Sequence, residues 1–261
     1  MMKLLLHTII RACALVFSFG MVLGTTPVVQ AAQTFVIGVE NQDYLPAYGL
    51  KDGKYQGFAR ELFDAFAKDH GYVFEYRALP VPRLYAAFFN GQVDFKFPDN
   101  THWKQDQRGG KPISYSDPVL TYIDGVVVPT DRKGVTTDEL RTLGTVAGFT
   151  PWAWMDRVSA GKVKVSENAS FEALVRQVVA RRIDGAYANI AVVNYQLDKV
   201  LGMPGALVFA PQLPYSRDHY HVSTMKHTTV VLELNAWLKQ KSSLVEAMKK
   251  RHGVEAGLPS R

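Results

Sequence analysis

The sequence predicts an α/β fold built around parallel strands, and two observations lead to this fold class. Short apolar segments with strand spacing alternate along the chain with longer segments whose apolar residues recur at helical spacing. Between residues 143 and 188 the expected order is strand, helix, strand, helix, strand, which implies a parallel sheet with right-handed crossovers. Hydrophobic residues make up 47% of the 261-residue chain, enough for a packed core in one large domain or two small ones.

Residues 1–31 have the composition of an export signal. Lys3 and Arg11 form a basic region, residues 12–24 are mostly apolar, and the small residues before position 32 suit a signal peptidase. The apolar run is too short for a membrane anchor, because a span needs about 20 residues. We therefore expect cleavage after Ala31 and a periplasmic protein. Cys13, the only cysteine, lies in this segment, so the mature chain is expected to contain neither a disulfide nor a lipid.

The charge balance argues against a nucleic-acid partner. Loss of Lys3 and Arg11 with the signal would lower the formal net charge from +6 to +4. A nucleic-acid-binding protein gathers Lys and Arg on one face, whereas here they are spread along the chain. The densest basic run, 249–252, ends an expected helix, where it complements the helix dipole.

The elements expected in the first half are strands at 35–40, 72–77 and 93–97 and helices at 57–70 and 82–90. The helix at 57–70 has Phe58, Leu62 and Phe66 on one face, and Gly71 is suited to end it. Residues 41–55 have the composition of a loop. The strand at 93–97 alternates apolar and charged residues, and we expect it to end at Pro98, which cannot donate to a sheet.

The elements expected in the second half are strands at 125–128, 143–147, 162–165, 184–188 and 206–209 and helices from Pro151 and at 171–182, 190–200, 228–239 and 243–252. Residues 211–220 are expected to return the chain from the second half to the first. Thr150 is expected to cap the helix from Pro151, because proline is pre-shaped for a first helical position.

Two loops are candidate sites. The polar loop after the strand at 93–97 carries Trp103 and Arg108, and ligands of open α/β sheets bind beyond the carboxyl ends of strands. The turn from Gly148 to Trp152 precedes a helix whose free amides would attract an anion. Capping alone would also explain Thr150. Trp152 and Trp154 should lie on different helix faces, so that one packs on the body and the other faces a cleft.

Arg83 is expected in the first turn of the helix at 82–90. A cation there is disfavoured by about 0.3–1 kcal/mol, because the helix dipole is positive at that end. The position is better explained if an anion meets the guanidinium. That anion is either a solute carboxylate or a local aspartate, and the residues leave both open.

The order of several motifs resembles family 3 of the bacterial solute-binding proteins, periplasmic receptors that capture small solutes such as amino acids for transporters. Gly91 begins a Gly-x-Val-Asp sequence, followed by a short strand, a loop with an arginine, and Tyr115-Ser-Asp-Pro. Gly38-Val-Glu and Tyr55-x-Gly-Phe precede them. The resemblance covers nearly the whole mature chain. It implies a two-lobed, type II periplasmic-binding-protein-like α/β fold, with a mainly parallel sheet flanked by helices in each lobe and a hinge between them.

The resemblance also implies how the lobes and the site are composed. Lobe 1 would comprise residues 33–122 and 222–261, and lobe 2 residues 123–221 with the hinge segments. Members hold a ligand carboxylate with an arginine and with a Ser or Thr after a glycine, where Arg108 and Thr150 are the nearest matches. The spacing around Arg108 departs from the family's pattern, so Arg83, Lys96 and Lys104 remain alternatives.

Asn189 is the second departure from the family's pattern. Members that bind α-amino acids often place an aspartate there to pair with the ammonium, and a neutral amide binds it about half as strongly. Either Glu40, Asp43 or Asp99 takes over, or the solute is not an ordinary α-amino acid. An aromatic of the first loop, Tyr44 or Tyr48, would lie over the ligand. The expected ligand-binding residues are Glu40, Tyr44, Arg83, Asp99, Trp103, Arg108, Thr150, Trp152 and Asn189.

The resulting expectation is a monomeric binding protein that closes on a small, polar, carboxylate-bearing solute and passes it to the membrane permease of an ABC transporter. No cofactor is expected, and no metal, because His219 and His221 lack a third ligand at a recognisable spacing. One alternative is a periplasmic enzyme on the same fold, of dehydratase or cell-wall-lytic type, which would need a well-placed acid; no Ser-His-Asp or Cys-His set is visible. Another is a solute sensor for a membrane receptor.

Overall fold

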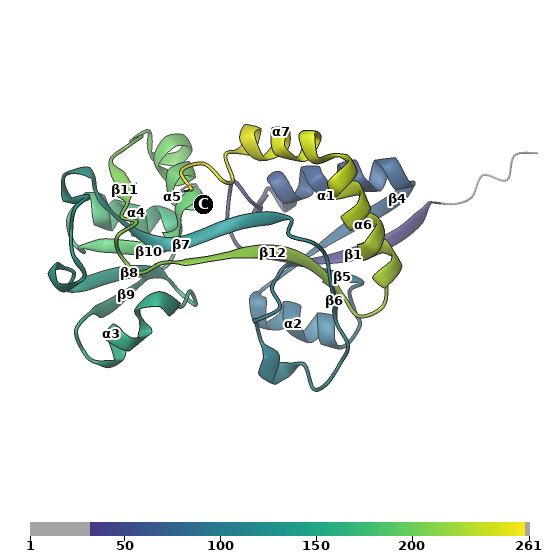
Figure 1. Ribbon diagram of the computed structural model, residues 1–261, viewed down its shortest axis with the longest axis horizontal. Coiled ribbons are helices and arrows are strands. Elements are labelled where there is room, and N and C mark those ends of the chain that lie inside the picture. Colours follow the sequence, from purple (N-terminus) through teal and green to yellow (C-terminus); the bar gives the residue numbers. More distant parts are fainter. Residues whose placement is uncertain (1–31, 259–261) are drawn as a thin grey trace, which may run out of the picture. The chain divides into compact units, whose positions relative to one another are not determined.

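Two long antiparallel strands, β7 (Leu120–Pro129) and β12 (Ser216–Thr224), run side by side through the middle of the fold (Figure 1). The computed structural model describes residues 32–258, so the expected signal peptide lies outside the described residues. The hydrogen-bonded strand order is β4-β1-β5-β12-β7-β10-β8-β9, with β11 added to β7 and β6 to β12. The paired strands β7 and β12 thus join two groups of parallel strands.

The first parallel group places β1 between β4 and β5. Its strands are β4 (Tyr72–Leu79), β1 (Gln33–Glu40) and β5 (Phe95–Asp99), and β6 (Ser114–Tyr115) pairs with β12. The accompanying helices are α1 (Phe58–His70), α2 (Val81–Phe89), α6 (Thr228–Gln240) and α7 (Ser242–His252). Gly71 ends α1 in the left-handed conformation, with φ 70°, as the sequence predicts.

The second parallel group confirms the predicted alternation of strands and helices. It consists of β8 (Thr142–Val146), β9 (Lys164–Asn168) and β10 (Gly185–Asn189), with β11 (Leu207–Phe209) on the far side of β7. The helices are α3 (Met155–Ser159), α4 (Phe171–Val179) and α5 (Ile190–Tyr195), and α5 continues as the π-helical segment η5 (Gln196–Leu201). Single 3₁₀ turns are η1 (Gln105–Gln107), η2 (Thr130–Arg132), η3 (Thr137–Glu139) and η4 (Trp152–Trp154).

Two local predictions were wrong. Strand β5 does not end before Pro98 but continues to Asp99, which pairs with His221 of β12. The β12 register shifts between His221 and Ser223, and proline is tolerated in a sheet at such irregularities because no regular ladder bond is lost. The segment expected to be a loop at 41–55 contains a small hairpin, β2 (Gly49–Lys51) with β3 (Lys54–Gln56).

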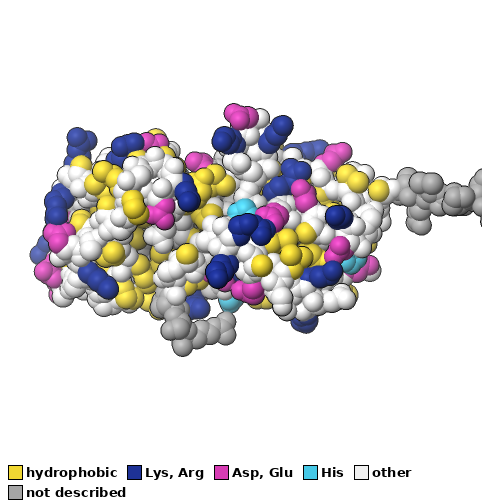
Figure 2. Space-filling model, turned by 90° about the horizontal axis from the view of Figure 1, so that it is seen from above, with side chains coloured by type: hydrophobic (Ala, Val, Ile, Leu, Met, Phe, Trp, Pro, Cys, Tyr) yellow, Lys and Arg dark blue, Asp and Glu magenta, His cyan; other side chains and the backbone are white. Residues whose placement is uncertain are grey.

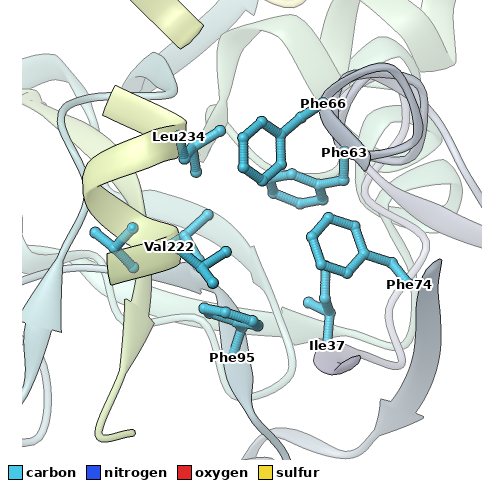
Figure 3. A pocket seen from close by; sticks show the side chains of 9 residues that line it. Ile37, Phe63, Phe66, Phe74, Phe95, Val222 and Leu234 are labelled. Carbon is cyan, nitrogen blue, oxygen red and sulfur yellow. The ribbon is translucent and has the colours of Figure 1, made fainter. Parts of the chain in front are cut away.

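The hydrophobic core beside the first parallel group is built mainly from phenylalanine. Phe63 and Phe66 of α1 point toward Leu234 of α6 and Val222 of β12 across a small void (Figure 3). The void measures about 10 Å³, which is room for one water molecule at most and far too little for a solute. This region is therefore a core, not a binding site.

Surface charge is mixed on the face drawn in Figure 2, where Lys and Arg side chains lie among Asp and Glu rather than in a single basic stripe. Among residues 32–258, no helix combines the length and the apolar character that a membrane span requires.

Candidate functional site

Three polar residues lie in one row across the middle strands. Asn189 of β10 is directly opposite Asp124 of β7, and Asp124 is directly opposite Ser216 of β12. Residues opposite each other on neighbouring strands project from the same face of a sheet. The side chains of these three residues therefore stand together where the two parallel groups meet.

The outer two members of this row are already hydrogen-bonded within the protein. Asn189 caps α5, because its Oδ1 accepts hydrogen bonds from the backbone N–H groups of Ala191 (3.0 Å) and Val192 (3.2 Å). The Ser216 hydroxyl is 2.9 Å from the hydroxyl of Tyr187. Asn189 is therefore a structural residue in this structure, whatever else it contacts.

Asp124, at the centre of the row, is different. Its Oδ1 is buried and has no hydrogen-bond partner among the described residues. Burial raises the pKa of Asp124 to about 7, and a hydrogen bond from the Asn189 side chain opposes this rise only in part. An acceptor that is buried without a donor costs free energy, and such groups in native structures call for an explanation.

Three tyrosines, Tyr44, Tyr122 and Tyr220, lie within electrostatic reach of this carboxylate and are called here the tyrosine cluster. The rings of Tyr122 and Tyr220 stack at 4.3 Å, and the Tyr220 hydroxyl donates to the Tyr44 hydroxyl at 3.2 Å. Burial raises the pKa of Tyr44 and of Tyr220, and the negative charge of Asp124 raises both further. The cluster is therefore neutral and lies within electrostatic reach of Asp124.

Tyr44 also connects residues that are distant in the sequence. Its ring stacks on Tyr48 at 5.0 Å and meets Phe171, the first residue of α4, edge-to-face at 5.4 Å. Trp103, in the loop after β5, approaches Tyr220 at 5.9 Å. Tyr44 and Trp103, both predicted from the sequence, thus lie against the same ring system.

A second buried group of charges lies on β1 and β5. Lys96 is completely buried, and its Nζ donates to the carbonyl of Pro98 at 2.6 Å and lies 3.2 Å from Oδ1 of Asp99. Asp99 also accepts a hydrogen bond from the Ser223 hydroxyl at 2.5 Å. The ammonium of Lys96 is 4.2 Å from the ring centre of Tyr85. Lys96 is therefore paired inside the protein.

Glu40 ends β1 beside this pair. Its Oε2 accepts a hydrogen bond of 2.7 Å from the Tyr48 hydroxyl. Burial raises the pKa of Glu40, while the charge of Lys96 acts in the opposite direction. Glu40 and Asp99, two of the predicted residues, are thus brought close to Lys96, and the charge of Glu40 also acts on Tyr44.

The predicted arginines differ in their surroundings. Arg108 turns back on its own loop, where its Nη2 donates to the carbonyls of Thr101 (2.6 Å) and Trp103 (2.8 Å). Its guanidinium also lies over the ring of Tyr115, 5.6 Å from the centre. Arg83 is exposed on α2, in the first turn as predicted.

The predicted helix after Pro151 is present, because the 3₁₀ turn η4 continues directly into α3. The predicted cap at Thr150 was wrong, since the N-cap is Pro151 and makes no side-chain hydrogen bond. The backbone N–H of Trp152 donates to the carbonyl of Thr150 at 2.9 Å, a tight turn that places Thr150 just outside the helical segment. The two tryptophans lie on different sides of this segment, as predicted. Trp154 is buried and its Nε1 donates to the carbonyl of Pro214, whereas Trp152 is 72% exposed.

A hollow of about 180 Å³ lies elsewhere, between α5, η5 and the end of α7. Asp198, Lys199 and Lys250 line it, and none of the predicted ligand-binding residues does. Its lining mixes opposite charges, and Arg251 and His252 at its edge are paired with Glu61. We therefore base the candidate site on Asp124 and the tyrosine cluster.

Sequence reasoning missed Asp124, Tyr122 and Tyr220. The signal was present, because residues 120–128 are rich in aromatic, β-branched and other apolar residues that favour a strand running through Asp124. Starting the strand at Gly125 placed Asp124 in a loop, although β7 begins at Leu120. Its register with Asn189 follows from tertiary pairing alone.

Comparison with known proteins agrees with this architecture. The family model described as "Bacterial extracellular solute-binding proteins, family 3" matches residues 35–251. A probable histidine-binding protein of Neisseria gonorrhoeae is 23% identical over 193 residues, which are 71% of this chain and 69% of that protein.

Solved structures show the same fold. An ancestral arginine-binding protein bound to arginine superposes with a TM-score of 0.65 at 17% identity, covering 85% of this chain and 99% of that one. An ancestral amino-acid-binding protein described as a precursor of cyclohexadienyl dehydratase gives 0.65 at 20% identity, covering 84% and 94%. The expected two-lobed, type II α/β fold is thereby confirmed, and the chain belongs to family 3 of the bacterial extracellular solute-binding proteins.

Proposed function

We propose that this protein is a periplasmic receptor that binds a small amino-acid-like solute between its two lobes and delivers it to the permease of an ABC transporter. The observation that carries the proposal is the buried, unpartnered oxygen of Asp124 beside three tyrosines, at the strands that join the two parallel groups. Named relatives that bind histidine and arginine support an amino acid as the class of solute.

The lobes are proposed to be residues 33–122 with 222–261 and residues 123–221. Strands β7 and β12 would then be the hinge, because they alone connect the two parallel groups within the described sheet. Hinge closure of this kind is a common way for binding proteins to enclose a ligand. Tyr44 and Phe171, which touch at 5.4 Å, would belong to opposite lobes.

The proposed site combines residues expected from the sequence with those found in the structure. Tyr44, Trp103 and the other two tyrosines enclose the solute, and Asn189 and Asp124 contact its polar end. A carboxylate on the solute would be met by Arg108 through guanidinium nitrogens other than Nη2, with Arg83, Thr150 and Trp152 nearer the rim. Glu40 and Asp99 hold Lys96 in place behind this surface.

Thermal unfolding of the exported protein in the presence of the twenty amino acids tests the proposal. A ligand at 100 times its Kd adds about 2.7 kcal/mol to the unfolding free energy. We expect one chemical class of amino acid to raise the melting temperature in a concentration-dependent way. If neither amino acids nor their amine and acid derivatives do so, the proposed function is wrong.

An enzyme on the same fold is the second candidate, and one observation favours it. A carboxyl with a pKa of about 7, as burial gives Asp124, suits general acid or base catalysis. The binding and enzymatic functions differ in the fate of the solute. When the protein is incubated with an amino acid that it binds, chromatography is expected to recover that amino acid unchanged. Appearance of more moles of product than of protein would favour the enzyme.

A further inference from the structure

We propose that Asp124 and the tyrosine cluster form an organic-cation subsite, so that the protein selects its solute by a positively charged group and not by a carboxylate. This inference rests on the proposed function, because it assigns the chemical class of solute to the same site. It differs from the sequence expectation, in which an arginine and Thr150 grip an anion and Asn189 weakens the binding of an ammonium.

The first step is the hydrogen-bonding inventory of the polar row. Asn189 Oδ1 is used by two backbone N–H groups of α5, and Ser216 is used by Tyr187. Oδ1 of Asp124 is the one side-chain oxygen of this row that is buried without a partner in the described structure. A carboxylate oxygen can only accept, so its complement must be a donor, and a cationic donor also neutralises the buried charge.

The second step is the shape and charge of the walls. The stacked rings of Tyr122 and Tyr220 and the linked hydroxyls of Tyr44 and Tyr220 present aromatic faces near this carboxylate. Asp218 lies directly opposite Tyr122 on β12 and so projects from the same face as Asp124. Burial raises the pKa of Tyr122, and the charges of Asp124 and Asp218 raise it further. Aromatic faces beside two acids favour an organic cation.

The third step is the state of the groups that would bind an anion. Nη2 of Arg108 is held by loop carbonyls, and Lys96 is held by Asp99 and the Pro98 carbonyl. Thr150 does not cap the helical segment formed by η4 and α3, and the backbone N–H groups of Trp152 and Trp154 already donate to the carbonyls of Thr150 and Pro151. Arg108 and Lys96 are thus paired inside the protein, whereas one oxygen of the acid at the centre of the site has no partner among the described residues.

Matched ligands separate the two modes of recognition. The probes are histidine, leucine and phenylalanine, each with its decarboxylated amine and its deaminated acid, together with arginine and agmatine, measured by calorimetry at pH 8. We expect an amine to bind within about tenfold of its parent amino acid and the corresponding acid not to bind. If amino acids bind and the amines do not, the cation subsite is wrong while the proposed receptor stands. If no probe binds, both are wrong.

A pair of isosteric variants tests Asp124 itself. Asp124→Asn keeps the shape and removes the charge, and we expect it to weaken binding of the amine at least tenfold. Asp117→Asn is the matched control, since Asp117 lies just before the same strand and pairs at the surface with Lys239. Binding by Asp124→Asn within twofold of the wild type would overturn the proposal, provided that its melting temperature shows it to be folded.

The aromatic wall is tested by two changes at Tyr122. Tyr122→Phe keeps the ring face and is expected to bind the amine nearly as well as the wild type. Tyr122→Leu keeps apolar bulk without a ring and is expected to lose roughly 2- to 30-fold, the range for a cation on an aromatic face. Equal losses in both variants would show that the hydroxyl or the packing matters and would overturn the role of the ring.

Discussion

Two buried aromatic regions of this molecule are built on opposite principles. The phenylalanine core, formed by Phe63, Phe66, Phe74 and Phe95 with their aliphatic neighbours, encloses a void of about 10 Å³ without a polar lining atom of consequence (Figure 3). The tyrosine cluster links its hydroxyls to one another and lies within electrostatic reach of Asp124, whose buried Oδ1 has no partner among the described residues.

The difference teaches where stability and function reside. Burial of a phenylalanine side chain contributes about 1.5–3 kcal/mol with no polar group to satisfy. A buried carboxylate costs free energy unless something compensates it. The core is therefore explained by folding alone, whereas the tyrosine cluster and Asp124 are explained only by an added interaction. Changes in the core should lower stability and leave affinity unchanged, whereas removal of the charge of Asp124 should lower affinity and raise stability.

The largest effect is expected from Phe66→Ala in the core. Removal of a buried phenylalanine ring loses its transfer free energy and leaves a cavity, which together cost about 3–5 kcal/mol. Denaturant unfolding monitored by circular dichroism measures this loss. The dissociation constant for the solute, measured where the variant is still folded, is expected to equal that of the wild type. A large loss of affinity at full folding would contradict the separation of the two regions.

Tyr48→Phe probes the boundary between the regions, because the Tyr48 hydroxyl donates to Glu40 while its ring stacks on Tyr44. Loss of a hydrogen bond to a charged group costs about 1.5–3 kcal/mol of unfolding free energy. The loss is expected to shrink as Glu40 becomes protonated at lower pH, since a neutral acid needs the donor less. A pH-independent loss would show that the ring's packing, not the hydroxyl, is responsible.

Asp124→Asn should change stability in the opposite direction. Burial raises the pKa of Asp124 from 3.8 to about 7, so the folded protein binds a proton that the unfolded chain has released between these values. Stability therefore falls as pH rises through this window. The asparagine variant escapes that fall and is expected to be about 1–3 kcal/mol more stable than the wild type at pH 8, the usual cost of an unsatisfied buried group.

The pH dependence provides the control for this variant. The stability gain is expected to be smaller at pH 5, where Asp124 is protonated in the folded wild type. Chemical denaturation at pH 5 and pH 8, without solute, measures both values. A variant that is less stable than the wild type at pH 8 would mean that the charge of Asp124 is compensated within the protein.

How much of the structure could be predicted from the sequence depended on whether the deciding interactions are local or between residues distant in the chain. Periodicity predicted α1 and its glycine end, and alternation predicted the parallel order of β8, β9 and β10, because both signals are local. Local rules failed at Pro98, which lies within β5, and at Thr150, which does not cap the helical segment that begins at Trp152. There tertiary pairing and turn geometry outweighed the preferences of single residues.

The candidate site was less predictable than the fold. Tyr44 and Trp103 were predicted from the order of the motifs. In the structure Tyr44 is hydrogen-bonded to Tyr220, and the ring of Trp103 packs against the ring of Tyr220. Asp124 could not be placed from sequence, because its importance arises from its register with Asn189, which lies 65 residues further along the chain (189 − 124 = 65) on a neighbouring strand. A carboxylate becomes informative only when the structure shows which of its oxygens is satisfied.

The smallest predicted effect, that of Ile37→Val, tests the comparison most strictly. Ile37 lines the void in the phenylalanine core and is in register with Phe95 on β5, so the change removes one methyl group at the void without disturbing the sheet. The expected loss is about 0.5–1.5 kcal/mol, seen as a lower denaturant midpoint with an unchanged m-value. Solute affinity should be unaltered, because Ile37 lies three residues before Glu40 on β1 and contributes no polar atom to the site. A change in affinity from so small a perturbation would mean that core packing sets the geometry of the tyrosine cluster, and the two regions would then have to be treated as one cooperative unit.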